Sequence, residues 1–449
     1  MLNADLTRLI SYAARIKHLT VTDQPGSRRI LATFNLFLPG GLLFQNLNTL
    51  RWLYSGLDFK YIQMFFSPTL SDLTFQCAAS HTNISLLSAL AYTCPKLRQV
   101  SMYFYHDYKG VASSAVIYPL PRIESLSAVC LTTAGLEYIG RLPTLRWLRL
   151  ETLPVIPDVI PSSDLFPALR DVELDGIDVT SAPQFFRMCS KAPLKSIYVA
   201  PSGDSTFALR DRSLRILFCF SNMTSLSLQS PRGFDISDVT IADAAQAWRR
   251  LESLKLTTVF PYTPVPLTLQ SLYHLAQYCS HLRSLEMTFD ATTIPSTAVP
   301  VMTQQQLASM DVANSPLANS GGVARFLSDI FRNLRTITAL REQTMRTSMN
   351  LQLTAMKLRC ILVGRPWGIS SQSLWLRGRR EGHVRVHDFR MGVRPVYPPL
   401  SNELTSLPDS NASPSAGGKN CFDARLAYVR FTYKRLDLVD ISRLFSENS

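Results

Sequence analysis

A six-residue pattern of the form apolar-x-x-apolar-x-apolar recurs thirteen times along this chain of 449 residues. Its copies begin at Ile16, Leu47, Leu70, Leu97, Ile123, Leu145, Leu169, Leu194, Met223, Leu251, Leu282, Leu307 and Leu334. Successive copies start between 22 and 31 residues apart, which is mostly close to the period of about 20 to 29 residues of one class of solenoid repeat. Each copy alternates as a strand does, so it predicts one short β-strand.

Amphipathic stretches between the sextets predict helices, because their apolar residues recur three and four positions apart. Examples are residues 85–94, 182–191, 241–250 and 269–279. Strand, loop and helix in regular succession predict an α/β leucine-rich-repeat solenoid of the horseshoe form, with about thirteen repeats, a concave parallel sheet and convex helices. The register of the second copy stays open, since Leu50 could also begin a sextet.

The sextets stop after Leu340, so we expect two regions: a solenoid over residues 1–342 and a basic, partly disordered region over residues 343–449. The formal net charge is +13, of which +8 belongs to residues 343–449. The last repeat of a solenoid needs a cover for its apolar edge. Either the C-terminal region provides that cover, or the sequence leaves its true reading frame near Thr344.

Composition and cysteine spacing favour an intracellular protein, in the cytoplasm or the nucleus. The longest apolar stretch, residues 30–44, is interrupted by proline and glycine, so we expect no membrane span. Asp5 and Arg8 interrupt the segment where a secretory signal would need apolar residues. The eight cysteines form no Cys-x-x-Cys pair, so we expect neither disulfides nor a metal site.

The motifs of the common enzyme classes are missing from the sequence. It contains no Gly-x-Gly-x-x-Gly, no Gly-x-Ser-x-Gly and no His-Glu-x-x-His. We therefore expect a binding protein without catalytic residues, cofactor or metal, monomeric by itself.

Positions three, five and seven of each sextet face away from the core, toward the surface on which solenoids usually bind their partners. On three consecutive predicted strands these positions hold Trp147, Arg149 and Glu151, then Asp171, Glu173 and Asp175, then Tyr198. Aromatic side chains surrounded by charges are typical of binding hot spots, so we predict a protein-binding site here. The alternative is an ordinary sheet surface, in which Arg149 pairs with Glu173 and a loop covers Trp147.

The C-terminal region offers a second, weaker candidate site for a ligand. Its arginines, Arg377, Arg379, Arg380, Arg385, Arg390 and Arg394, could neutralise phosphates and bind nucleic acid weakly. A solvated basic tail has the same composition, and no recognition module accompanies these residues. We therefore do not expect nucleic acid to be the main ligand.

Three segments show the characteristic sequence of the repeats most clearly. They are Phe44 to Trp52 (FQNLNTLRW), Phe166 to Leu174 (FPALRDVEL) and Tyr278 to Met287 (YCSHLRSLEM). In these segments the chain resembles the fungal F-box/leucine-rich-repeat proteins, whose repeats are of the ribonuclease-inhibitor-like type. The likeness spans about residues 1–342. The segment that begins at Leu6 is similar to the one that follows the F-box in that family, and we find no F-box helices before it.

The resemblance implies a function in protein degradation. In that family the F-box docks the adaptor of a cullin-type ubiquitin ligase, and the repeats present a substrate for ubiquitination. We therefore expect a substrate-recognition scaffold of such a ligase, which would contact the adaptor if an F-box is encoded upstream. A free-standing interaction protein or inhibitor without a link to ubiquitin is the alternative.

Overall fold

The computed structural model describes residues 10–22, 27–37, 44–53, 59–156, 165–177, 182–201, 208–258, 265–295 and 304–339. All of them belong to one compact unit of the chain. The region predicted to be basic and partly disordered, 343–449, lies outside the described residues, as does the basic segment that could bind nucleic acid. The predictions made for them, including the boundary at residue 342, remain predictions.

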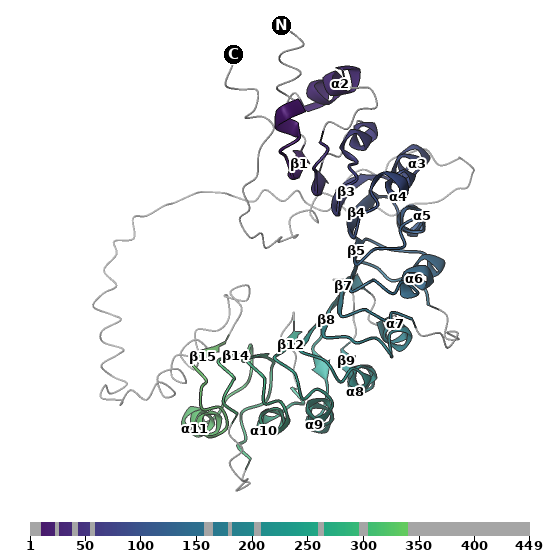
Figure 1. The fold of residues 1–449 in the computed structure, drawn as a ribbon. Coiled ribbons are helices and arrows are strands. Elements are labelled where there is room, and N and C mark those ends of the chain that lie inside the picture. Colours follow the sequence, from purple (N-terminus) through teal and green to yellow (C-terminus); the bar gives the residue numbers. More distant parts are fainter. Residues whose placement is uncertain are drawn as a thin grey trace, which may run out of the picture. The chain divides into compact units, whose positions relative to one another are not determined.

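Thirteen strands of the described part form one parallel sheet, in which they follow one another in chain order (Figure 1). They are β1 (His18–Thr22), β2 (Thr49–Leu53), β3 (Asp72–Ala78), β4 (Gln99–Tyr105), β5 (Ser125–Ala128), β6 (Trp147–Leu150), β7 (Asp171–Ile177), β8 (Ser196–Pro201), β10 (Ser225–Ser230), β12 (Ser253–Thr258), β13 (Ser284–Glu286), β14 (Ser309–Asp311) and β15 (Thr336–Thr338). Each begins two residues after a predicted sextet start. The register of the second copy is settled by β2, which fits a sextet beginning at Leu47.

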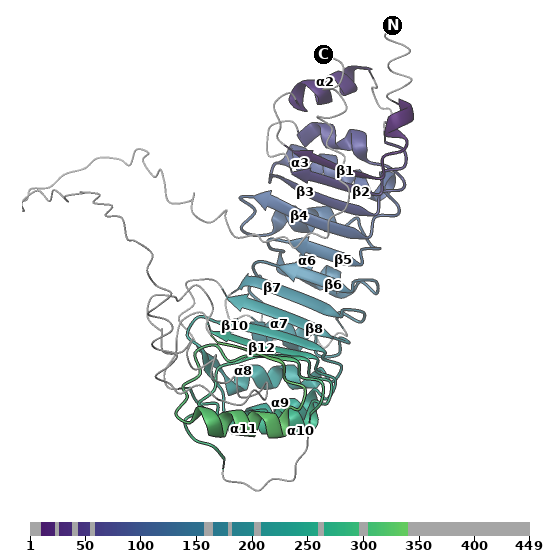
Figure 2. The same cartoon turned by 90° about the vertical axis from the view of Figure 1, so that its left-hand side faces the viewer.

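The helices lie along one face of this sheet (Figure 1). They are α2 (Ser27–Phe37), η1 (Phe59–Phe65), α3 (His81–Ser88), α4 (Leu90–Thr93), α5 (Val111–Ile117), α6 (Thr133–Gly140), α7 (Ala182–Met188), α8 (Asp211–Arg215), η2 (Ile216–Cys219), α9 (Asp238–Ala247), α10 (Leu269–Tyr278) and α11 (Ser320–Ile330). We call the opposite face, which Figure 2 shows, the open face. It corresponds to the face that the sequence predicted as concave. The α/β leucine-rich-repeat horseshoe class is confirmed.

The core is built from the apolar positions of the sextet. Positions one, four and six are buried in every described repeat except at Ile16 and Ala339, which are partly buried. A fully buried leucine or isoleucine contributes about 1.5 to 3 kcal/mol, so three continuous rows of such side chains hold the repeats together. Because these positions point inward, the residues that alternate with them along the strand, at positions three, five and seven, are forced onto the open face.

A row of backbone hydrogen bonds joins the repeats just before the strands, at sextet position two. The carbonyl oxygen of Arg146 accepts from the N–H groups of Arg170 and Asp171, at 2.8 and 3.0 Å. The carbonyl oxygen of Arg170 accepts in the same way from Lys195 and Ser196, at 2.7 and 3.0 Å. The arrangement recurs from the carbonyl of Lys17 to that of Ala308 and fixes the register of neighbouring strands.

A small second sheet pairs β9 (Leu209–Arg210) with β11 (Phe234–Asp235). Within the described ranges, no helix is long and apolar enough to cross a bilayer.

Candidate functional site

The open face carries the predicted site on three adjacent strands. The sheet register pairs Trp147 with Asp171, and Arg149 with Glu173 and then Tyr198. Asp175 pairs with Ala200 further along the same strands. The residues that we call the central patch are therefore neighbours: Trp147, Arg149 and Glu151, which directly follows β6, with Asp171, Glu173 and Asp175 of β7 and Tyr198 of β8.

Arg149 holds the centre of this patch. Its guanidinium lies 3.1 Å from Asp175 Oδ2 and 3.9 Å from Glu173 Oε2. The relative exposures of the three side chains are 26% for Arg149, 38% for Glu173 and 43% for Asp175. The pairing of Arg149 with Glu173, expected for an ordinary sheet surface, is present, and Asp175 is an additional and closer partner. Such half-exposed pairs add little stability, about 0 to 1 kcal/mol, but they fix the direction of the charges.

The carboxylates of the central patch are partly desolvated. Burial raises the pKa of Glu151 and of Glu173, and in both cases the Arg149 guanidinium lowers the pKa in part. Burial also raises the pKa of Asp171, and the charges of Arg170 and Lys195 lower this pKa in part. A partner that brings a positive charge would therefore meet acidic groups that have already lost part of their hydration.

The two predicted aromatic anchors, Trp147 and Tyr198, are both half-buried. Gln229 Nε2 donates a hydrogen bond to the Tyr198 hydroxyl at 3.1 Å, which restrains the phenol ring. Adjacent strands lie about 4.8 Å apart, so β6 and β8, which carry these residues, are about 10 Å apart across β7. Tyr198 also lies two residues further along the strand direction than Trp147. Each ring keeps part of its surface available to a partner.

A bulge in β7 shapes the acidic end of the patch. The register with β8 shifts between Asp175 and Ile177, and Gly176 between them has φ +75°. A Cβ atom at this position would lie 3.3 Å from the Glu151 carbonyl oxygen. Glycine is therefore required by its backbone angle and by its neighbour, and it lets β7 pass close to Glu151.

A group of tyrosines beside the patch was missed in the prediction from sequence. Tyr103 and Tyr105 of β4 meet edge to face, with ring centroids 5.4 Å apart. Tyr103 is 41% exposed and Tyr108, in the following turn, is 75% exposed. Burial raises the pKa of Tyr103, and the nearby Glu151 carboxylate and Tyr108 raise it further. The signal was available, because Tyr103 is position seven of the sextet that begins at Leu97.

A row of cations on the other side of the patch was also missed. Arg146, Arg170 and Lys195 occupy sextet position two of three consecutive repeats, directly before β6, β7 and β8. All three side chains are exposed. Position two belongs neither to the core nor to the strand face, so the sextet pattern alone assigns it no function. The recurrence of a basic residue at this position in three consecutive repeats was the feature of the sequence that could have predicted the row.

Asp107 shows that a buried carboxylate need not belong to a site. It is 7% exposed and accepts hydrogen bonds from the backbone N–H groups of Ala112 and Ser113, at 3.2 and 2.9 Å. The Ser113 hydroxyl donates to it as well, at 2.9 Å. These bonds satisfy the free N–H groups at the start of α5, so the function of Asp107 is structural.

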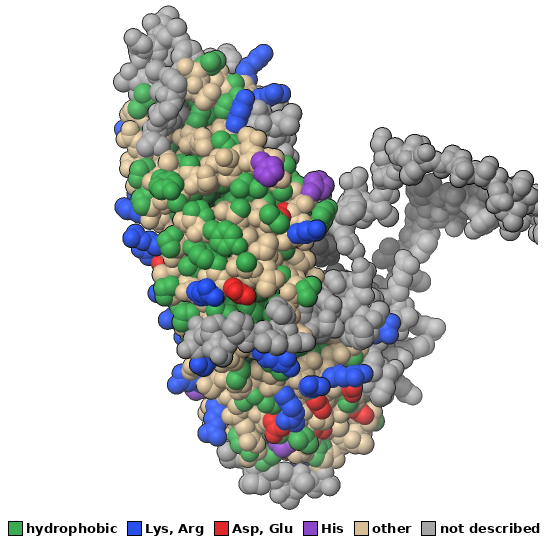
Figure 3. Space-filling view, turned by 90° about the vertical axis from the view of Figure 1, so that its right-hand side faces the viewer, with side chains coloured by type: hydrophobic (Ala, Val, Ile, Leu, Met, Phe, Trp, Pro, Cys, Tyr) green, Lys and Arg blue, Asp and Glu red, His purple; other side chains and the backbone are tan. Residues whose placement is uncertain are grey.

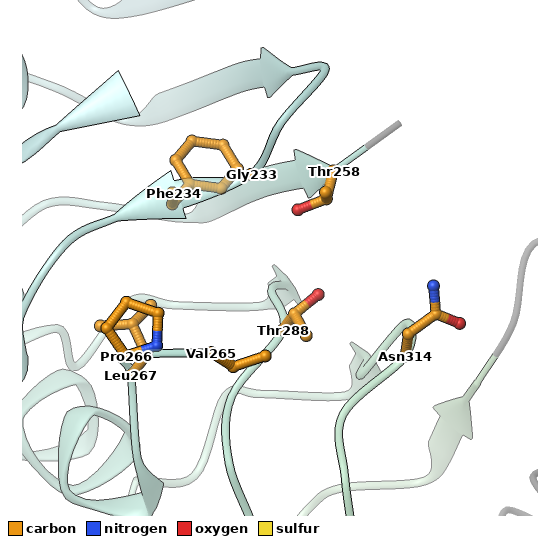
Figure 4. Close-up of a pocket in the computed structure, with 8 residues that line it drawn as sticks. All are labelled: Gly233, Phe234, Thr258, Val265, Pro266, Leu267, Thr288 and Asn314. Carbon is orange, nitrogen blue, oxygen red and sulfur yellow. The ribbon is translucent and has the colours of Figure 1, made fainter. Parts of the chain in front are cut away.

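The pocket in Figure 4 lies among the loops that follow β10, β12, β13 and β14. Its lining consists of Gly233, Phe234, Thr258, Val265, Pro266, Leu267, Thr288 and Asn314. The cavity volume is about 30 Å³, room for about two water molecules. Sites for small organic ligands measure about 300 to 1,000 Å³, so this pocket does not provide one.

The buried cysteine thiols have the properties of packing residues rather than of reactive groups. Burial raises the pKa of the thiols of Cys77 and Cys279 to about 12 and that of Cys94 to about 11. Thiols in this state are poor nucleophiles. In the part of the chain that the structure describes, no group of three or more His, Cys, Asp or Glu residues could hold a metal ion.

The helical face differs in character between its two halves (Figure 3). The helices α3 to α6 carry one Asp, Glu, Lys or Arg residue in their sequences, Glu137. Among their exposed side chains are Tyr92 (89%) and Val111 (59%). The helices of this surface therefore carry few charges that could orient a partner, unlike the central patch.

No family model and no curated protein matches the chain. A solved structure of TLR13 in complex with ssRNA13 shows 12% identity and a TM-score of 0.36, over 66% of this chain and 46% of that one. The chain thus spans less than half of that protein. The complex of Rad7 and Elc1 from yeast shows 13% identity and a TM-score of 0.35, over 77% of this chain and 86% of that one. The register and the buried rows of this chain itself define it as an α/β leucine-rich-repeat solenoid.

Proposed function

We propose that this protein is a binding scaffold whose central patch holds a protein partner. One observation carries the proposal: the sheet register brings two half-buried aromatic rings and five charged side chains together on an otherwise hydroxyl-rich face. Aromatic rings ringed by charge are typical of the residues that dominate binding energy at interfaces. The Arg149 pairs order these charges before binding, which lowers the entropic cost of association.

A macromolecular partner fits this surface better than a small molecule does. The patch is part of a sheet face rather than a cavity, and the pocket described above is too small for an organic ligand. A protein partner can cover several strands at once. In this proposal the chain binds and positions its partner and carries no chemical step itself.

The proposal extends to the kind of assembly. We infer a substrate-recognition scaffold of an F-box-type, cullin-based ubiquitin ligase inside the cell. The sequences of the repeats at Phe44, Phe166 and Tyr278 support this assignment. The structure supports it only through the repeat fold, which provides a rigid face on which a substrate could be presented.

The test is a purification of the tagged full chain from its native cells, followed by mass spectrometry. Adaptor and cullin subunits that copurify with the chain support the ligase assignment. Stable partners without these subunits would instead define a free-standing scaffold or inhibitor. A parallel purification of the Trp147→Ala variant shows which partners depend on the central patch, and Tyr92→Ala on the helical face is the matched control.

A further inference from the structure

The charges around the central patch are sorted along the strand direction. Arg146, Arg170 and Lys195 lie directly before β6, β7 and β8, at sextet position two. Glu151 and Asp175 lie at position seven of the first two of these repeats. Five residues separate the two positions, which corresponds to about 17 Å along a strand. Asp171 lies at the start of β7, beside Arg170 and Lys195. Because the three cations outnumber it, these three repeats are net positive at the edge where the strands begin and negative where they end.

The negative edge also carries exposed aromatic surface. Strands β5 and β6 are four residues long, while β4 and β7 on either side have seven residues each (Figure 2). Ser101 of β4 is in register with Ser127 of β5 and Arg149 of β6. Two residues further on, Tyr103 therefore shares a row with Glu151, and the small Val129 lies between them.

We infer that this face binds an extended segment of the partner protein that runs along the strands, with an acidic residue over Arg170 and Lys195 and a basic residue over Glu151 and Asp175. Tyr103 and Trp147 would pack against the segment. The inference rests on the proposed function, because it names the chemistry of the partner for the same site.

Charge complementarity selects this occupant. A uniformly basic segment would be repelled at Arg146, Arg170 and Lys195, and a uniformly acidic one at the carboxylates. Arg149 is one guanidinium among Glu151, Glu173 and Asp175, so the negative edge keeps a net negative charge. An exposed tyrosine ring also attracts a cation through the negative face of its π system. A segment with separated charges meets a partner group at both edges.

The size of the surface fits a single extended chain. An extended residue advances about 3.3 Å, so a segment needs about five residues between its opposite charges. The charged residues lie on or next to three strands, β6 to β8, whose spacing of about 4.8 Å gives a width that one strand-like segment and its side chains cover. Tyr103 lies beside this track, on β4. Pairing with the backbone is not required, because β4 to β8 already pair with each other.

The experiment uses the full chain and two fluorescein-labelled peptides of identical composition. One peptide has three aspartates and three arginines in separate blocks with a five-residue Gly/Ser spacer between them. In the other, the aspartates and arginines alternate. We expect the block peptide to bind about ten times more tightly in fluorescence anisotropy at low salt, and the difference to shrink at 0.5 M salt, where exposed charges are screened.

Two sets of variants locate the binding. The double variant Arg170→Glu with Lys195→Glu should remove the preference for the block peptide. The control, Arg249→Glu with Arg250→Glu, makes the same change of charge next to α9 and should leave this preference intact. Tyr103→Ala should weaken binding of the block peptide several-fold, in contrast to Tyr92→Ala. Circular dichroism shows that each variant is folded.

Three results would overturn the inference. They are equal affinity for the two peptides, a preference that survives Arg170→Glu with Lys195→Glu, and self-association of the chain that Tyr103→Ala abolishes, which would identify a second copy as the occupant. The proposed function fails separately. If Trp147→Ala removes a copurifying partner while the two peptides bind alike, the site stands and the extended segment does not.

Discussion

The guanidinium of Arg149 donates a hydrogen bond to Asp175 Oδ2 at 3.1 Å, from β6 to β7 and from sextet position five to position seven. The contact is therefore diagonal, whereas Glu173 lies directly opposite Arg149 in the register. It pulls the cation toward the negative edge of the open face. This leaves one ordered positive charge among three carboxylates and sets the polarity on which binding would depend.

A double-mutant cycle measures the strength of this contact. Arg149→Gln, Asp175→Asn and the double variant should give a coupling free energy of about 0.5 to 1 kcal/mol in urea unfolding, since both side chains are partly exposed. Arg98 and Glu124, 2.8 Å apart with exposures of 64% and 30%, form the reference pair. A coupling near zero for Arg149 and Asp175 would mean that the pair does not order the patch in solution.

Partner binding should depend on the aromatic and acidic residues of the central patch. Trp147→Ala removes a half-buried ring from the open face, and a loss of about 2 kcal/mol, or roughly thirtyfold in Kd, is typical of a hot-spot tryptophan. Glu173→Arg reverses one charge of the patch. Both variants should keep the wild-type circular dichroism spectrum, so titration calorimetry with a captured partner reports on binding alone. Unchanged affinity in both would move the site elsewhere on the solenoid.

Stability should respond to the protonation of Glu151. Burial raises the pKa of this carboxyl above its ordinary value of 4.5, so the folded protein binds the proton more tightly than the unfolded chain does. The protonated form therefore stabilises the fold at low pH, and this contribution is lost as the pH rises through the raised pKa.

Glu151→Gln removes the titrating group. We expect the Tm of the variant, relative to wild type, to be higher at pH 7 than at pH 4.5. Differential scanning fluorimetry across this range is the measurement, with Glu137→Gln on the helical face as the control. An equal difference at both pH values would show that the pKa of Glu151 is not raised.

Two glycines should respond in opposite ways to alanine. Gly110 has φ +69°, and a Cβ atom there would lie 2.6 Å from the Leu131 backbone nitrogen. Gly110→Ala should therefore destabilise the protein by about 2 kcal/mol or more. Gly321 lies in α11, and its Cβ would meet only Asn319 Oδ1, at 3.8 Å. Gly321→Ala should stabilise by up to about 1 kcal/mol. Urea titrations compare the two, and a loss in both variants would contradict the local geometry of α11.

Thiol labelling should separate the cysteines by burial. Cys219 is exposed, while Cys77, Cys94 and Cys279 are buried with raised pKa values. Iodoacetamide at pH 8 should therefore modify Cys219 in the native protein before these three, and should reach the buried three only after guanidinium is added. Peptide mapping by mass spectrometry gives the order. Early modification of Cys94 or Cys279 would indicate local opening of the helix ends that precede β4 and β13.

The sextets predicted all thirteen strands because an alternating pattern with one buried face permits little freedom of register. Helix boundaries were less exact. The stretch 85–94 is two helices, of which the first starts at His81, because the Ser80 side chain accepts a hydrogen bond from the Asn83 backbone. Likewise α9 starts at Asp238, after the capping residue Ser237. Both serines were visible in the sequence as capping signals.

The central patch was predictable for the same reason as the strands, since position numbers place side chains on rows. The partner of Arg149 was not, because a long guanidinium side chain can reach carboxylates on two different rows. Tyr103 was also not linked to Glu151. That proximity spans the short strand β5, and strand lengths cannot be derived from the sextet.

The paired N–H groups that bind each position-two carbonyl are repeated at successive junctions between the repeats from Lys17 to Ala308. A junction between two repeats that are not natural neighbours would offer the same acceptor and the same two donors. Duplication or loss of a whole repeat outside β4 to β8 would therefore keep the backbone hydrogen bonds at the new junction and disturb the fold little. Lineages of this protein could differ in length while inheriting an unchanged central patch.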